Sequence, residues 1–182
     1  MIETTQSVPV AVGIDRVWAY VRDIRRWAEL MPGLQDCEIL GDDDSRWVLK
    51  VGVGGLVRTV RVDVHVDRWA GPGSVLFSFK LQGDPVKGGG SYHAVATGPD
   101  AITMNLSLRV EGSGPMAPMW EAMGGPLLPR FALAFAEQLA EGIEDEYGGN
   151  GARVPAGQPA RRAPFALLIW LWRALFGRRR QA

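Results

Sequence analysis

Residues that could move protons, attack a substrate or hold a metal ion are scarce in this sequence. It has two histidines, His65 and His93, and one cysteine, Cys37, which is too few for a metal-ligand cluster or a disulfide framework. No Ser-His-Asp order, G-x-S-x-G elbow or H-E-x-x-H motif is present. His65 is expected on the outward face of its strand, whereas His93 could point to either face. We therefore predict no catalytic residue, no metal site and no covalent cofactor, and so a protein that is not an enzyme.

A run of three glycines, Gly88-Gly89-Gly90, comes closest to a phosphate-binding motif. A phosphate loop needs the start of a helix directly after it, because free backbone N–H groups at that start bind the anion. Here the run leads into SYHAVATG, a weakly patterned strand. We predict that the three glycines form a flexible hairpin connection.

Apolar side chains offer the other kind of chemistry, which is the binding of a lipophilic molecule. Several large apolar residues fall on the inward positions of two strands or on one face of a helical stretch near residue 120. Taken alone, a residue of this kind is more often part of an ordinary core than a ligand contact, and the sequence leaves both interpretations open. The candidate ligand-binding residues are Phe77, Phe79, Met104, Met119, Trp120, Met123, Leu127 and Phe131.

The elements that would position these residues are mostly strands. Residues 7–12 form a short first strand, and two short helices follow, the first with Asp15 as its expected N-cap. From Trp47 onward apolar and polar residues alternate, as in Val60, Val62, Val64 and Val66, and the last strand runs from Ile102 to Val110. Such alternation indicates an antiparallel sheet that is covered on one face only.

A long amphipathic helix then supplies the cover. Met119, Met123, Leu127, Phe131, Phe135 and Leu139 recur at every fourth residue. Gly124-Gly125-Pro126 and Pro129 interrupt the pattern, so we expect a break there and a continuous helix only after Pro129. The predicted fold is therefore α+β and of the helix-grip type. In it, a curved antiparallel sheet of about seven strands wraps around a long C-terminal helix, and two short helices follow strand 1.

The charge is divided unevenly along the chain. Residues 1–147 carry all 20 acidic residues and 13 of the 20 Lys and Arg, and so a net charge of −7. Residues 148–182 carry seven Arg and no acid. An acidic body argues against nucleic acid as a partner, since phosphate binding needs a basic surface.

The basic tail has the composition of a membrane anchor. Residues 1–147 are assigned to the helix-grip domain, 148–163 to a Gly- and Pro-rich linker, and 164–180 to the anchor. The apolar run from Phe165 to Phe176 is too short to span a bilayer, and Arg flanks both of its ends. We expect it to lie in the interface at the cytoplasmic face, although docking on its own domain or on a partner protein is the alternative. The predicted membrane-binding residues are Phe165, Leu168, Trp170, Trp172, Phe176, Arg178, Arg179 and Arg180.

Residues 4–147 resemble the G-type subunit family of carbon monoxide dehydrogenases, a branch of the START-like (SRPBCC), polyketide-cyclase-like helix-grip superfamily. The resemblance rests on the run VWAYVRDIRRWAELMPGLQDCEIL, on GDDDSRWVLKVGVGGL with Gly52 and Gly54, on the Gly83 to Gly90 hairpin and on Gly112 in the closing strand. The Gly124-Gly125-Pro126 break departs from the family pattern. The resemblance implies a membrane-bound accessory protein of a carbon monoxide dehydrogenase or related molybdenum hydroxylase.

These features together give a hypothesis with two alternatives. The tail holds the domain on the cytoplasmic membrane, and the cavity between sheet and long helix takes up a lipophilic molecule, namely a quinone of the menaquinone or ubiquinone type. The first alternative is a purely structural recruiter of the enzyme with a filled core. The second is a cyclase- or aromatase-like enzyme with polar groups such as Tyr92, His93 or Asn105 inside the cavity.

Overall fold

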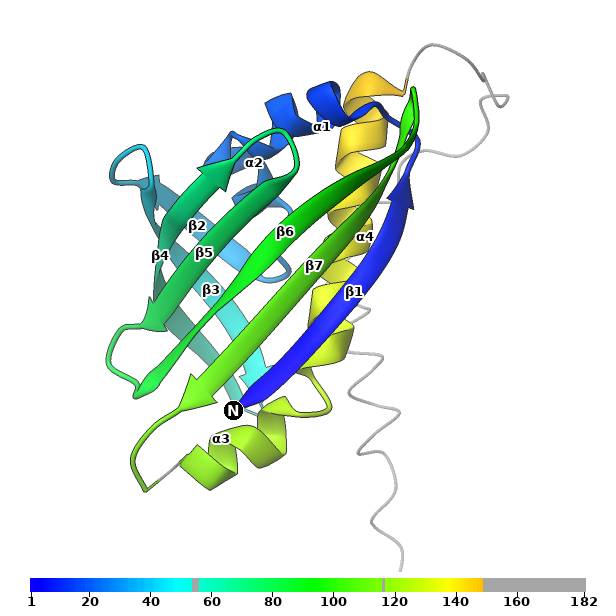
Figure 1. Cartoon of the computed structure of the whole chain (residues 1–182). Helices are drawn as coiled ribbons and strands as arrows, with labels where there is room; N and C mark the ends of the chain where they lie inside the picture. The colour runs from blue at the N-terminus through cyan, green and yellow to red at the C-terminus, as the bar shows by residue number, and fades with distance from the viewer. Residues whose placement is uncertain (54–55, 116, 149–182) are drawn as a thin grey trace, which may run out of the picture. The chain divides into compact units, whose positions relative to one another are not determined.

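The computed structural model describes residues 1–53, 56–115 and 117–148 of this chain (Figure 1). In chain order the elements are β1 (Ile2–Val10), α1 (Ile14–Val21), α2 (Ile24–Glu29), β2 (Leu34–Ile39), β3 (Asp44–Val53), β4 (Leu56–Ala70), β5 (Ser74–Leu81), β6 (Val86–Gly98), β7 (Ala101–Gly112), α3 (Ala117–Gly124) and α4 (Leu128–Tyr147). Apart from Gly148, the predicted linker (148–163) and anchor (164–180) lie outside the described residues.

One antiparallel sheet contains all seven strands in the order β1-β7-β6-β5-β4-β3-β2. The predicted fold class is thereby confirmed, including the two short helices after the first strand. The first strand is longer than predicted, since β1 begins at Ile2 and not at Ser7. It pairs with β7 from Ile2 opposite Val110 to Val10 opposite Ile102, and this continuous ladder supports residues whose own pattern is weak.

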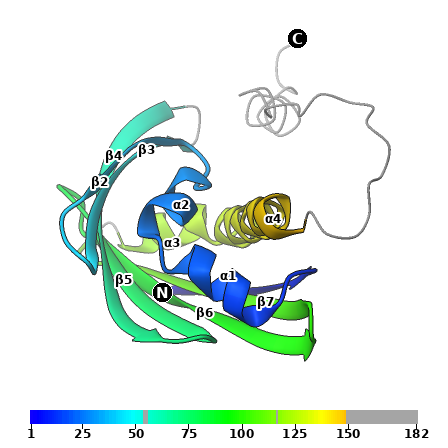
Figure 2. The ribbon, with the colours of Figure 1, turned by 90° about the horizontal axis from the view of Figure 1, so that it is seen from above.

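The long helix α4 lies inside the curve of the sheet, as Figure 2 shows from above. Its sheet-facing side buries large and small residues in alternation, and the small ones allow the helix to approach the strands closely. The predicted inward residues of β4, Val60, Val62, Val64 and Val66, are all buried in the same core. The buried residues of α4 are Ala132, Phe135, Ala136, Leu139, Ala140 and Ile143.

The two short helices begin differently from the prediction. Gly13, not Asp15, is the N-cap of α1, and it supplies no side-chain cap; Asp15 lies within the first turn. At α2 the cap is Asp23, whose carboxylate accepts a hydrogen bond from the Arg25 N–H at 3.0 Å. Gly33 then turns the chain into β2. Its φ of +84° is a backbone conformation that favours glycine.

The break in the last helix is confirmed. α3 ends at Gly124, and α4 begins at Leu128, so Pro129 occupies the first turn, where its missing N–H is not needed. Figure 1 shows α3 at the opposite end of α4 from α1 and α2.

The three glycines are not a hairpin connection, contrary to the prediction, because they lie inside β6. Gly88 and Gly90 pair with Phe79 and Phe77 of β5, and the missing side chains make room for those rings. A Cβ added at Gly90 would lie 2.7 Å from Cζ of Phe77 and would overlap the Ser107 carbonyl oxygen. Glycine is thus a packing requirement in the middle of this strand.

Replacing Gly90 by alanine should therefore lower the free energy of unfolding by about 1–3 kcal/mol, because the added methyl has no space. Gly98→Ala on the same strand is the matched control, since its Cβ would meet nothing closer than Ala101 Cβ at 3.9 Å. Its effect should stay within about 0.5 kcal/mol. Urea unfolding followed by tryptophan fluorescence compares the two variants. Equal losses, or no loss at Gly90, would contradict this packing.

Candidate functional site

A small cavity lies between the sheet and α4, beneath the two short helices. Its volume is about 20 Å³, and its walls come from α1, α2, three strands and α4. The lining consists of apolar and aromatic side chains. They are Val21, Trp27, Val75, Phe77, Tyr92, Leu106, Phe135 and Leu139.

Contacts with the C-terminal part of α4 hold the roof of this cavity in place. Arg26 of α2 forms an ion pair with Glu146 of α4. Gly142 gives the Tyr20 hydroxyl of α1 room, because a Cβ there would lie 2.9 Å from that oxygen. The Ala11 N–H, just after β1, donates to Glu144 Oε1 at 2.7 Å.

Two of the lining residues, Trp27 and Tyr92, each carry a buried polar atom without a hydrogen-bond partner among the described residues. Neither Trp27 Nε1 nor the Tyr92 hydroxyl makes a hydrogen bond within the described part of the chain. Their side chains are 6% and 3% exposed. Burial raises the pKa of Tyr92 far above its ordinary value, so the hydroxyl keeps its proton and remains able to donate.

Of the three polar residues considered for a cyclase-like cavity, the structure places only Tyr92 inside. His93 is exposed, and Asn105 is on the outward face, where its side-chain oxygen accepts a hydrogen bond from Ser7 Oγ at 2.5 Å. The described lining residues thus include no histidine and no carboxylate.

The predicted ligand-binding residues are not all brought together. Phe77 lines the cavity, Phe79 is half-buried further along β5, and Met104 is fully buried in the core. Phe131 is half-buried on α4, and Leu127, just before that helix, is 42% exposed. Met119, Trp120 and Met123 belong to α3, but their side chains lie outside the described part of the structure.

Sequence reasoning missed most of the lining residues because they lie in elements whose sequence pattern does not show which face is inward. Trp27 lies in a helix of six residues, which is too short for a periodicity to show which face is inward. Tyr92 was considered only for the cyclase-like alternative, and its pairing opposite the inward Val75 of β5 is what places it inside. Inward glycine and alanine around Tyr92 hide the alternation in the sequence.

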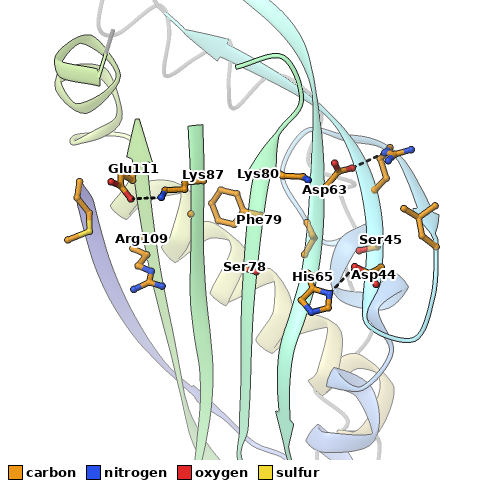
Figure 3. A pocket seen from close by; sticks show the side chains of 15 residues that line it. Asp44, Ser45, Asp63, His65, Ser78, Phe79, Lys80, Lys87, Arg109 and Glu111 are labelled. Carbon is orange, nitrogen blue, oxygen red and sulfur yellow. Dashed lines mark hydrogen bonds and ion pairs between the residues drawn. The ribbon is translucent and has the colours of Figure 1, made fainter. Parts of the chain in front are cut away.

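A second hollow lies on the outer face of the sheet, across β3 to β7 (Figure 3). It is open, has a volume of about 850 Å³, and is lined by charged side chains of both signs. Arg46 pairs with Asp63 at 2.8 Å, His65 with Asp44 at 2.8 Å, and Lys87 with Glu111 at 3.5 Å. The two charges within each pair neutralise one another, and each pair near the surface contributes little to stability.

The His65–Asp44 pair gives a pH prediction. The hydrogen bond to the Asp44 carboxylate raises the pKa of His65 above its ordinary value. The pair therefore adds its full stabilisation below about pH 6.5, and the stabilisation is lost as the pH rises through the raised pKa. It should be small, since the two side chains are 51% and 58% exposed.

NMR titration of the His65 ring should show a midpoint that falls toward the ordinary value in Asp44→Asn. An unchanged midpoint in that variant would contradict the assignment of the shift to Asp44.

Among the residues that the structure describes, no three or more His, Cys, Asp or Glu residues are grouped so that they could hold a metal ion. No helix in the same part of the chain combines the length and the apolar character needed to cross a bilayer.

Solved structures with the same fold cover most of the chain. A conserved protein from Geobacillus kaustophilus matches with a TM-score of 0.69 at 16% identity, over 80% of this chain and 97% of its own. A START superfamily protein from Mycobacterium smegmatis has a TM-score of 0.59 at 19% identity, over 80% of this chain and 97% of its own. The Zhui aromatase/cyclase from Streptomyces sp. R1128 has a TM-score of 0.56 at 19% identity, over 82% of this chain and 98% of its own.

At these identities the structures show the fold alone. No curated protein sequence matches the chain at a significant level. A family model does match, over residues 1–144, which include every wall of the interior cavity. The chain therefore belongs to the polyketide cyclase / dehydrase and lipid transport family.

Proposed function

We propose that this protein binds a lipophilic molecule between its sheet and α4. The observation that carries the proposal is the interior cavity with its apolar lining, two residues of which, Trp27 and Tyr92, carry buried donors that have no partner among the described residues. A core whose only task is stability would be expected to satisfy or replace such groups, because each one costs about 1–3 kcal/mol.

The ligand needs more space than this cavity provides. A volume of about 20 Å³ holds one water molecule, whereas ligand pockets measure several hundred Å³. Toward the α3 end, the inward side chains of Phe79, Leu81 and Phe131 are only half-buried. In this proposal the ligand's polar end reaches Trp27 and Tyr92, and its chain displaces these looser side chains along α4.

The junction of α3 and α4 is the proposed place of entry. Leu127, the N-cap of α4, makes no side-chain capping hydrogen bond and is 42% exposed. Residues 125–127 contain the Gly-Pro part of the predicted break. Pro126 has no N–H, so a movement of α3 would have to open only the hydrogen bonds from Gly125 N–H to Glu121 O, at 3.0 Å, and from Leu127 N–H to Gly124 O, at 3.1 Å. α3 would then act as a lid.

The setting of this binding function is inferred from the sequence. The resemblance to the G-type subunits of carbon monoxide dehydrogenases supports an accessory of such a dehydrogenase, or of a related molybdenum hydroxylase, at the cytoplasmic face of the membrane. The basic, apolar tail supports attachment there, and a membrane quinone is the ligand that suits such an enzyme. A role in binding, and not in catalysis, is supported by a described lining without a residue that titrates near neutral pH.

The full chain, produced in a quinone-containing bacterium, should carry a stoichiometric lipophile that native mass spectrometry detects and solvent extraction identifies. Leu106→Phe, which fills the cavity, should lose it. Leu108→Phe is the matched control on the same strand and face, buried but not in the lining. A folded protein that carries no lipophile and takes none up from added lipid would overturn the proposal in favour of the recruiter with a filled core.

A further inference from the structure

The exposed face of α4 carries a line of acids, called here the acidic stripe. Glu137, Glu141 and Asp145 follow one another at four-residue spacing, so they lie on one side of the helix over about 12 Å. All three are exposed, and within the described part of the chain none of them forms an ion pair or a side-chain hydrogen bond. Leu133, one turn before Glu137 and 39% exposed, continues the same line with an apolar side chain.

The distribution of charge on α4 works against the helix. Like charges four residues apart repel each other, and acids near the C-terminus meet the negative end of the helix dipole. α4 has no base in its last turn, and its one base, Arg130, lies near the opposite end, where a cation is disfavoured. The other two acids of α4 do have partners, since Glu144 accepts a hydrogen bond from the Ala11 N–H and Glu146 pairs with Arg26.

Acids elsewhere on the surface are also compensated. On the outer face of the sheet, Asp63 pairs with Arg46 and Glu111 with Lys87, each from a neighbouring strand. The acidic stripe has no such neighbour among the described residues. A cationic group supplied from outside them would therefore relieve the repulsion within the stripe.

A segment of the same chain has the complementary charge. Residues 148–182 contain seven Arg and no acid, and four of these Arg fall within residues 173–180. Residues 149–172 separate that segment from the end of α4, and 24 residues can extend over at most about 80 Å, so the chain is long enough to return to the stripe. Because both partners belong to one chain, even a weak contact is favoured by a high effective concentration.

We propose that the acidic stripe of α4 binds the Arg-rich end of its own chain, residues 173–180, and that this contact competes with an anionic membrane for the same arginines. The contact goes beyond the proposed function, whereas the competition rests on the membrane attachment proposed there. An anionic leaflet offers many more negative charges than the stripe and takes the arginines over. The stripe thereby restricts attachment to strongly anionic membranes.

NMR spectra of the backbone amides test the contact in the full chain without lipid. At low salt, the amide resonances around the acidic stripe should differ between the wild type and the variant with Arg178, Arg179 and Arg180 changed to Gln. The difference should vanish at high salt, because salt screens exposed charges. Tenfold dilution should leave the wild-type spectrum unchanged, since both partners belong to one molecule.

Binding to vesicles of phosphatidylglycerol and phosphatidylcholine tests the competition. The stripe variant, Glu137→Gln with Glu141→Gln and Asp145→Asn, should bind roughly three- to tenfold more tightly than the wild type, because its arginines are no longer held by α4. Its unfolding midpoint in urea should stay the same or rise, since the variant removes repulsion within the helix.

The matched control removes the same charge from three other exposed acids, in Glu3→Gln with Asp42→Asn and Asp100→Asn. None of these three forms an ion pair or a side-chain hydrogen bond among the described residues. The control therefore measures the general effect of a less acidic body on vesicle binding, and its gain should stay within about twofold.

The outcomes separate the contact from the membrane attachment. Stripe amides that are the same in the wild type and the tail variant, or differences that depend on protein concentration, would overturn the contact within one chain. Equal gains in the stripe variant and its control would overturn the competition. If no form of the protein binds vesicles, the membrane attachment of the proposed function fails, and the amide spectra still decide the contact.

Discussion

Replacing Phe135 by alanine should lower the free energy of unfolding by about 3–5 kcal/mol. The ring is 3% exposed, and it lies on the face of α4 that packs against the sheet. It also forms part of the cavity wall, so its removal would enlarge an existing void that the surrounding rings cannot easily close. Urea unfolding followed by tryptophan fluorescence measures the loss.

Leu133→Ala is the matched control for this prediction. Leu133 lies on the same helix but is 39% exposed, and alanine is the better helix former. Its effect should therefore stay within about 0.5 kcal/mol. Similar losses in the two variants would mean that α4 does not pack through the Phe135 face, and the helix-grip arrangement around the cavity would have to be revised.

The fold was predictable where each element carries its own pattern. The valines of β4 alternate over the whole buried face, and the glycine-proline break divides the last helix where the structure does. The prediction was wrong where contacts with a neighbouring strand determine the structure of a segment. Gly88-Gly89-Gly90 has the composition of a loop, but the rings of Phe77 and Phe79 across the strand pair make it part of a strand. The start of β1 similarly depends on its ladder with β7.

The site was less predictable than the fold, because its residues come from segments whose orientation only tertiary structure fixes. The choice among Tyr92, His93 and Asn105 depends on strand register, which sets Tyr92 opposite Leu106 and His93 opposite Asn105. Large apolar residues on a long helix gave a clear signal at Phe131 and Leu127, but the enclosed space lies nearer to Phe135 and Leu139, under α1 and α2. That Trp27 lacks an acceptor among the described residues is a property of the packed interior, which a sequence does not display.

Changing Arg178, Arg179 and Arg180 to glutamine should weaken the binding of the full chain to anionic vesicles by roughly 100-fold. Each arginine near an anionic surface contributes about 1 kcal/mol, so the three together contribute about 3 kcal/mol, and every 1.4 kcal/mol is about tenfold in affinity. The apolar run from Phe165 to Phe176 should still give weak binding to neutral vesicles, because its hydrocarbon is unchanged. Vesicle co-sedimentation at low and high salt measures both contributions, and added salt should reduce the wild-type affinity more than that of the variant.

The control removes the same charge from the outer face of the sheet, in Arg61, Arg68 and Arg109, which are exposed. This triple variant should bind anionic vesicles nearly as well as the wild type, since the body to which it belongs is acidic overall. A loss as large as that of the tail variant would instead place the membrane contact on the sheet, and the linker would no longer be needed to explain attachment. If the tail variant alone loses binding, the basic tail and not the sheet carries the electrostatic part of membrane attachment, as the charge division along the sequence predicts.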